Sequence, residues 1–263
     1  MFGCTKNKIV DSSVNIVLRF NSNTTSCFSN MTSLEKIRVR LAKTLSEGIQ
    51  LNLSIEKFKE LLRSYLNTKI NLVIMFVDIS RSTEMSLSLP ERKFALLVQC
   101  FAQEVSIAAI DYGGYVFKYE GDGVIVIFPA EHDEVKACKN ALNCSKAILE
   151  VIKVSNKAFS EYELPEISVR IGMTYGHGLV VLYGNDSEKA SIDMIGSSIS
   201  LASKIVSIAD PNHILVGEYF YSMIRPSKFI NCSNFTELSL NPTKWKYLSR
   251  SDPHSRFRVY EYY

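Results

Sequence analysis

The chemistry suggested by the sequence begins with two aspartates, each placed where an apolar run stops. Residues 72–77 form a continuous apolar run that is typical of a buried strand, and Asp78 follows it directly. The runs 115–119 and 124–128 predict the two strands of a hairpin with Asp122 in its turn, where an Asp-Gly pair favours type I′ geometry. Because consecutive strands usually lie side by side, we expect both carboxylates at one end of a sheet. Such hard oxygen ligands suit Mg²⁺ or Mn²⁺.

Each aspartate alone has a simpler interpretation. Aspartate is common in turns and at the N-terminal caps of helices, and Asp78 precedes the hydroxyl residues Ser80, Ser82 and Thr83. The prediction of a metal site therefore depends on the two aspartates together.

The elements around these runs follow the order strand, helix, strand, strand, helix, strand. Pro90 is expected to begin a long helix that reaches residue 110, and a second long helix is predicted over 131–158, followed by a strand over 167–173. This order predicts an α+β fold with the ferredoxin-like β-α-β-β-α-β arrangement. Beyond it the sequence predicts a strand over 177–183, a loop with Asp193, a helix ending near residue 209, a strand over 214–216, a helix over 218–224, and strands over 235–240 and 257–262.

The first seventy residues are expected to lie outside this unit. Residues 1–31 combine a short β-like run with a Ser/Asn/Thr cluster typical of a loop or of disorder. Residues 32–70 predict two amphipathic helices, capped by Ser33 and Ser54. Their basic residues could touch a membrane surface, but we expect the helices to pack on the main domain, 71–263, or on a second copy of the chain.

Composition excludes several classes of function. The chain has 263 residues, 46% of them hydrophobic, and a net charge of +3, which is too balanced to indicate nucleic-acid binding. Six cysteines without C-x-x-C spacing predict reduced thiols and a cytoplasmic location, and Cys100, Cys138 and Cys144 fall in helical patterns as small hydrophobic residues. We expect neither a secretory signal nor a transmembrane segment. Trp245, the only tryptophan, is expected to be a packing anchor.

Four motifs together resemble a known family. They are FVDIxxST at 76–83, KxxGDG at 118–123, RIGMTYG at 170–176 and DMIGSSISLASKI at 193–205. In this order they resemble the catalytic domain of class III nucleotidyl cyclases, over roughly residues 70 to 260. The resemblance implies an adenylate cyclase, which converts ATP to 3′,5′-cyclic AMP and pyrophosphate with two Mg²⁺ or Mn²⁺ ions per site.

The resemblance also assigns roles to residues. Asp78 and Asp122 match the metal-binding aspartates, and the carbonyl of Ile79 would complete the second metal site. One ion would activate the 3′-oxygen while the other binds the β and γ phosphates. Lys118 and Asp193 fall where the family keeps the pair that recognises adenine.

Three further positions are expected to contact phosphate. The N–H groups of residues 80–83, including Ser82 and Thr83, would form an anion cradle at the start of a helix. Lys246 is placed like the mobile lysine that binds the terminal phosphates. His177 is a weaker candidate, because a surface histidine explains it as well.

The transition-state positions depart from the family. Where the usual motif has Asn and Arg, this chain has Ser200 and Lys204. Serine is shorter than asparagine, and lysine brings a point charge in place of a planar fork, so the exchange is not conservative and slow turnover is expected.

In this family the metal aspartates come from one protomer, and the base-recognising and transition-state residues come from the other. The resemblance therefore implies a homodimer with two shared sites. Two alternatives stay open: a guanylate or pyrimidine (cytidylate or uridylate) cyclase, and a nucleotide-binding regulatory module that has lost catalysis.

Overall fold

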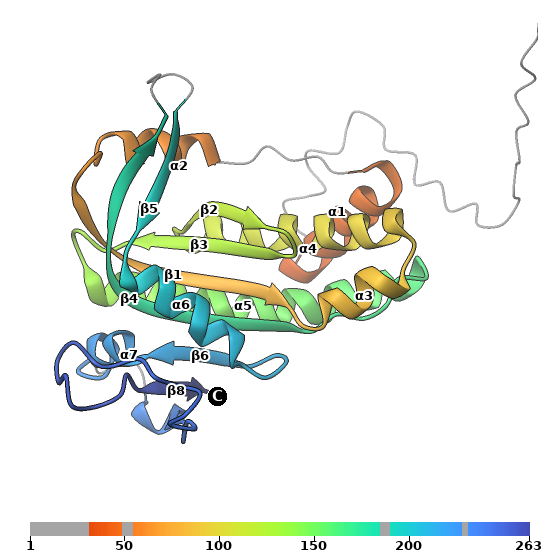
Figure 1. Ribbon diagram of the computed structural model, residues 1–263. Coiled ribbons are helices and arrows are strands. Elements are labelled where there is room, and N and C mark those ends of the chain that lie inside the picture. The colour runs from red at the N-terminus through yellow and green to blue at the C-terminus, as the bar shows by residue number, and fades with distance from the viewer. Residues whose placement is uncertain (1–31, 49–54, 185–189, 228–230) are drawn as a thin grey trace, which may run out of the picture.

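A mostly antiparallel sheet forms the centre of the computed structural model, which describes residues 32–48, 55–184, 190–227 and 231–263 (Figure 1). Its strands are β1 (Lys69–Ile79), β2 (Tyr115–Glu120), β3 (Gly123–Pro129), β4 (Val169–Tyr183), β5 (Ser191–Ile195), β6 (Ile214–Gly217), β7 (Phe235–Glu237) and β8 (Val259–Tyr262). They are ordered β2-β3-β1-β4-β6-β8-β7, and β5 pairs with β4 outside this path. The first four strands in this order are those of the ferredoxin-like unit, so the predicted α+β fold is confirmed.

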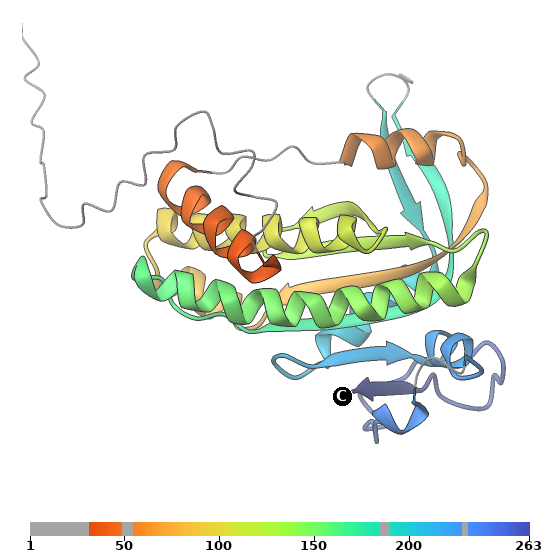
Figure 2. The same cartoon turned by 180° about the vertical axis from the view of Figure 1, so that it is seen from behind.

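Helices cover both faces of this sheet. They are α1 (Ser33–Glu47), α2 (Ile55–Arg63), α3 (Ser82–Ser88), α4 (Glu91–Asp111), α5 (Glu134–Glu161), α6 (Ser197–Ser207) and α7 (Glu218–Ile224), with a short 3₁₀ turn at Cys232–Asn234. The long helices α4 and α5 lie side by side on one face, with α1 across them (Figure 2). Helix α6 lies on the opposite face against β4 and β1.

Strand β1 divides the core between the two faces. Its side chains alternate, so Val73, Met75 and Val77 pack under α4 and α5, whereas Leu72 and Ile74 belong to the cluster on the opposite face. All five side chains are buried. By the same alternation Asp78 falls on the second face, the one that carries α6.

Glycines in β4 let α6 approach the sheet closely. A Cβ atom on Gly172 would clash with the backbone of Val206, and one on Gly176 would clash with Ser198 Oγ. Both glycines lie within one continuous strand of 15 residues. The prediction of two separate strands, 167–173 and 177–183, is therefore wrong, because the chain passes through Gly176 without a turn.

Both helices of the N-terminal extension pack on the sheet domain. Ile37 and Leu41 of α1 join the core formed with α4 and α5, and Phe58 and Leu62 of α2 join the cluster on the other face. Helix α1 begins with a capping box between Thr32 and Glu35, one residue earlier than the Ser33 cap that was predicted. Ser54 and the β-like run of the first 31 residues lie outside the described residues.

Most predicted helices and strands are confirmed, with shifted ends. Helix α7 has the predicted bounds, α5 begins three residues late because Asp133 caps it, and β7 ends at Glu237. Strand β5 was not predicted. The buried thiols Cys100, Cys138 and Cys144 are free, and Trp245 is buried with its Nε1 donating to the Phe257 carbonyl at 2.7 Å, both as expected.

Helix α4 is the one described helix whose length and composition would suit a membrane span, and half of its most apolar stretch is buried inside the protein. It packs between α1, α5 and the sheet. Its buried residues include Gln103 and Glu104, which are polar. These are the features of a helix in the core of the domain.

Candidate active site

Asp78 and Asp122 converge at one end of the sheet. Asp78 pairs in register with Gly123 of β3, so the hairpin tip brings Asp122 next to it. Burial raises the pKa of Asp78 to about 6, and the neighbouring Asp122 carboxyl adds to this rise. The convergence predicted from the sequence is therefore present.

The hairpin turn differs from the predicted type I′ geometry. That geometry requires a positive φ at both central residues, Gly121 and Asp122. Only Gly121 has one, at +61°. The glycine thus takes the left-handed position, and Asp122 keeps an ordinary backbone conformation at the tip.

A third charged residue, Arg170, belongs to this group and was not predicted from the sequence. Arg170 is the register partner of Asp78 on the other neighbouring strand, β4, and its Nη2 contacts Asp78 Oδ2. Its charge opposes the rise in the pKa of Asp78. The available signal was the alternation of β4, in which Val169 and Ile171 are buried on the α4/α5 side and Arg170 must face the other way.

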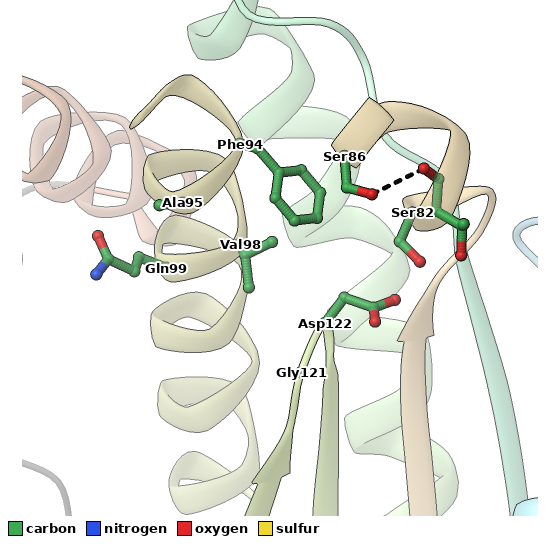
Figure 3. Close-up of a pocket in the computed structure, with 9 residues that line it drawn as sticks. Ser82, Ser86, Phe94, Ala95, Val98, Gln99, Gly121 and Asp122 are labelled. Atoms are coloured by element: carbon green, nitrogen blue, oxygen red, sulfur yellow. Dashed lines mark hydrogen bonds between the residues drawn. The ribbon is translucent and has the colours of Figure 1, made fainter. Parts of the chain in front are cut away.

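A pocket of about 430 Å³ opens beside Asp122 (Figure 3). Its walls come from three elements: the start of α3, the first turns of α4 and the hairpin tip. The lining residues are Ser82, Thr83, Ser86, Phe94, Ala95, Val98, Gln99, Gly121 and Asp122. Arg81 precedes α3 in a left-handed conformation, and no side chain caps the helix, so its first N–H groups have no capping partner. The structure thus brings Ser82 and Thr83 together with Asp122.

Lys118 and Asp193 form a second charged pair, on β2 and β5. Lys118 Nζ lies 2.5 Å from Asp193 Oδ2, and the two side chains are 36% and 23% exposed. Asp193 Oδ1 accepts a hydrogen bond from the Met194 N–H at 2.7 Å. Asp193 was expected in a loop, and its position in β5 fixes it against the partner strand β4.

A β-bulge directs Lys118 to this partner. Val116 pairs with Val126, whereas Lys118 pairs with Ile125, so Phe117 is an extra residue in β2. Regular alternation would have placed Lys118 on the same side as Val116, under α4. The bulge instead places it on the side of Phe117 and Ile125, which belong to the cluster on the opposite face.

Ser200 and Lys204 lie four residues apart on α6, and both are exposed. Residues at this spacing share one side of a helix. Among the described residues, no hydrogen bond or ion pair joins either of them to Asp78 or Asp122. The structure therefore does not bring the predicted transition-state positions to the carboxylate pair within one chain.

Lys246 is exposed, and a different positively charged side chain, that of Arg250, lies at α6. Arg250 Nη2 donates to Ser197 Oγ at the start of that helix. Burial lowers the pKa of His177, and the charges of Arg250 and Lys69 lower it further. The sequence analysis did not single out Arg250, and its only signal was its proximity to Lys246 in the chain.

The carboxylate pair fits a hard divalent cation. The part of the chain that the structure describes has no group of three or more His, Cys, Asp or Glu side chains arranged for a metal. Mg²⁺ is commonly held by only one or two carboxylates, with waters and substrate phosphates completing its shell. Two neighbouring carboxylates, one of them beside an open pocket, provide such a set.

Comparison with known proteins identifies the family of the chain. A sequence model of the adenylate and guanylate cyclase catalytic domain matches residues 64–247. The chain belongs to this cyclase family. The match spans the positions of the predicted site residues Asp78, Asp122, Lys118, Asp193 and Lys204, and it ends just beyond Lys246.

Two relatives of this cyclase are named for their product. A cytidylate cyclase from Staphylococcus aureus is 30% identical over 165 residues, which are 59% of this chain and 38% of that protein. A cytidylate cyclase from Escherichia coli is 25% identical over 152 residues, which are 56% of this chain and 34% of that protein. The matched region is thus less than two fifths of either relative.

Solved cyclase structures share the fold. The adenylyl cyclase CyaB from P. aeruginosa superposes with a TM-score of 0.63 at 23% identity, over 74% of this chain and 95% of that one. The guanylate cyclase domain of RhGC from Catenaria anguillulae, in complex with GTP, gives a TM-score of 0.61 at 21% identity, over 74% and 98% of the two chains.

Proposed function

We propose that this cyclase converts a nucleoside triphosphate with an amino base, CTP or ATP, into the 3′,5′-cyclic monophosphate and pyrophosphate. The observation that carries the proposal is the Lys118–Asp193 pair, which presents one donor and one acceptor side by side. Guanylate and uridylate cyclisation are less favoured, because guanine and uracil present a keto oxygen and a ring N–H at the same edge.

The pair distinguishes amino bases from keto bases. Adenine and cytosine both present an amino group next to an unprotonated ring nitrogen, so Asp193 can accept from the amine while Lys118 donates to the ring nitrogen. A site that hydrogen-bonds its substrate in this way rejects an analogue with the reversed pattern, since its own partly buried groups would be left unpaired.

CTP is the first candidate of the two. Both named relatives are cytidylate cyclases, and their alignments cover more than half of this chain. ATP is the second candidate, because the Lys118–Asp193 pair matches the adenine-recognising positions of the family and fits adenine by the same hydrogen bonds. We expected ATP from the sequence alone.

Asp78, Asp122 and the Ile79 carbonyl are proposed to hold two Mg²⁺ or Mn²⁺ ions, which would lower the charge on the attacking 3′-oxygen and bridge the phosphates. Ser82 and Thr83 line the pocket beside Asp122 and offer N–H groups to the phosphates.

The remaining roles require a second copy of the chain. Ser200 and Lys204 are exposed on α6 without a contact to the carboxylates, which supports a homodimer in which they complete the partner's site. Lys246 and Arg250 are proposed to contact the triphosphate from the same side. A cytoplasmic location is supported by the free thiols of the buried cysteines.

The test uses the purified chain with Mn²⁺ and each of the four nucleoside triphosphates, with products identified by mass spectrometry. We expect cyclic CMP or cyclic AMP to form at least about tenfold faster than cyclic GMP or cyclic UMP. A preference for GTP or UTP would overturn the amino-base assignment. Binding of nucleotide without any cyclic product would instead support a regulatory module that has lost catalysis.

A further inference from the structure

The Asp78 carboxylate is shared between two neighbouring strands. Its Oδ1 faces β3, where a Cβ atom on Gly123 would lie 3.9 Å away, and the Asp122 carboxylate lies nearby at the hairpin tip. Its Oδ2 contacts Arg170 Nη2 on β4. Oδ1 therefore lies on the side of Asp122, where the metal ions are proposed to bind, and Oδ2 contacts the guanidinium of Arg170.

We propose that Arg170 competes with the metal: a guanidinium that occupies Asp78 Oδ2 weakens cation binding at the Asp78–Asp122 pair. This inference rests on the metal role proposed for the two aspartates. It adds a residue to that site.

The charge balance supports this role. Two carboxylates side by side repel each other, and a guanidinium within contact distance offsets one of the two negative charges. A divalent cation that arrives at the pair then meets a net charge of about −1 rather than −2, and it is repelled by the guanidinium. Removing the guanidinium should therefore strengthen cation binding.

The contacts of Arg170 also suggest that it can be displaced. Arg170 Nε is buried and has no hydrogen-bond partner among the described residues, and Asp78 is the only carboxylate paired with this guanidinium there. A guanidinium has five N–H donors, so a single contact leaves most of its capacity unused. The two side chains are 27% and 26% exposed, which leaves room for an incoming ion.

A purely structural role makes a different prediction. If Arg170 only holds β4 to β1 as a cross-strand ion pair, its removal would leave Asp78 less well placed. Cation binding would then be weaker or unchanged. The direction of the change in metal affinity separates the two roles.

The experiment measures Mn²⁺ binding to the nucleotide-free full chain, with free Mn²⁺ followed by electron paramagnetic resonance. We expect Arg170→Gln to bind Mn²⁺ about tenfold more tightly than the wild type, and Arg170→Lys, which keeps the charge, to bind like the wild type. Lys153→Gln is the matched control, because it makes the same change in net charge by breaking an exposed pair with Glu150 on α5. It should leave Mn²⁺ affinity unchanged.

Equal or weaker Mn²⁺ binding by Arg170→Gln overturns the proposal. If circular dichroism shows that this variant does not fold, Arg170→Met, which keeps the unbranched stem, replaces it with the same expectation. Asp78→Asn and Asp122→Asn separate this inference from the proposed function. If they retain Mn²⁺ binding, the metal assignment itself fails; if they lose it while Arg170→Gln does not bind more tightly, only the role of Arg170 fails.

Discussion

Lys118 Nζ lies 2.5 Å from Asp193 Oδ2, although the two residues are 75 positions apart in the chain. The contact joins the edge strand β2 to β5, which pairs with β4 outside the main order of the sheet. It places one donor and one acceptor next to each other, partly shielded from water. The selection of the base is therefore expected to depend on both residues equally.

Replacing one member of this pair should reduce the use of amino-base triphosphates. Lys118→Met leaves Asp193 without its donor and removes one hydrogen bond to the base, at a cost of about 1–3 kcal/mol, or roughly fivefold to 150-fold in kcat/KM. The measurement compares kcat/KM for CTP, ATP, GTP and UTP. Lys153→Met, an exposed lysine on α5, is the control, and an equal loss in both variants would contradict the assignment.

Changing the hydrogen-bonding pattern of the Lys118–Asp193 pair should change which base the enzyme prefers. Lys118→Glu combined with Asp193→Cys removes the donor for the ring nitrogen and supplies an acceptor for a ring N–H. We expect the ratio of kcat/KM for GTP over CTP or ATP to rise by at least about tenfold. An unchanged ratio in a folded double variant would show that the base is recognised elsewhere.

Removing either metal carboxylate should abolish cyclisation. Asp78→Asn and Asp122→Asn keep the side-chain volume, but they remove one of the two charges that hold the cations, so turnover should fall by more than about a hundredfold. Circular dichroism and thermal unfolding verify that each variant is folded. Near-normal turnover in either one would refute its role as a ligand.

Mixing two inactive variants should restore activity if the sites are shared between protomers. A heterodimer of Asp78→Asn with Lys204→Ala combines both defects in one site and keeps the other site intact. With random pairing, half of the dimers are mixed and each has one working site, so we expect about a quarter of wild-type activity. Absence of recovery, with mixed dimers verified by two affinity tags, would argue against shared sites.

The sequence predicted the framework of the fold because its signals are local. The continuous apolar run of β1, the helical spacing in α4 and α5 and the glycine in the hairpin each determine an element without help from distant residues. The positions of Asp78 and Asp122 at one sheet end follow from strand pairing alone. Their roles as metal ligands remain predictions.

The parts that the sequence did not predict depend on register between distant strands. The family resemblance paired Lys118 with Asp193, but their contact requires the extra residue Phe117, and nothing in the local pattern marks that bulge. The contact of Arg170 with Asp78 depends on the pairing of β4 with β1. Strand β5 was missed because its five residues, which include Ser191 and Asp193, were interpreted as part of a loop.

The packing of α6 on β4 predicts that alanine substitutions at two glycines of the same strand cost very different amounts of stability. Gly172→Ala would place a Cβ atom against the backbone of Val206, which cannot move away as a flexible side chain can, so a loss of about 1–3 kcal/mol is expected. Gly178→Ala is the control, because its nearest contacts lie at an ordinary 3.6 Å. Urea unfolding measures both, and equal losses would contradict the close approach of α6.

The docking of α1 on α4 predicts a large loss of stability when one charged side chain, that of Arg40, is replaced. Glu104 is 1% exposed, and Arg40 of α1 contacts both of its carboxylate oxygens, with Nε donating to Oε1 at 2.7 Å. Arg40→Met leaves a buried carboxylate unpaired, so the free energy of unfolding should fall by about 3 kcal/mol. Lys93→Met is the control, since its pair with Glu163 is exposed and its loss should cost at most about 1 kcal/mol.

The double variant Arg40→Met/Glu104→Leu tests the cause of that loss. Because replacing a buried ion pair with apolar side chains removes the unpaired charge, most of the stability lost in Arg40→Met should return. Urea unfolding of the three proteins gives the coupling energy between the two positions. If the double variant is as unstable as Arg40→Met, the loss of stability comes from the packing of the Arg40 side chain on α1 rather than from the unpaired carboxylate of Glu104 on α4.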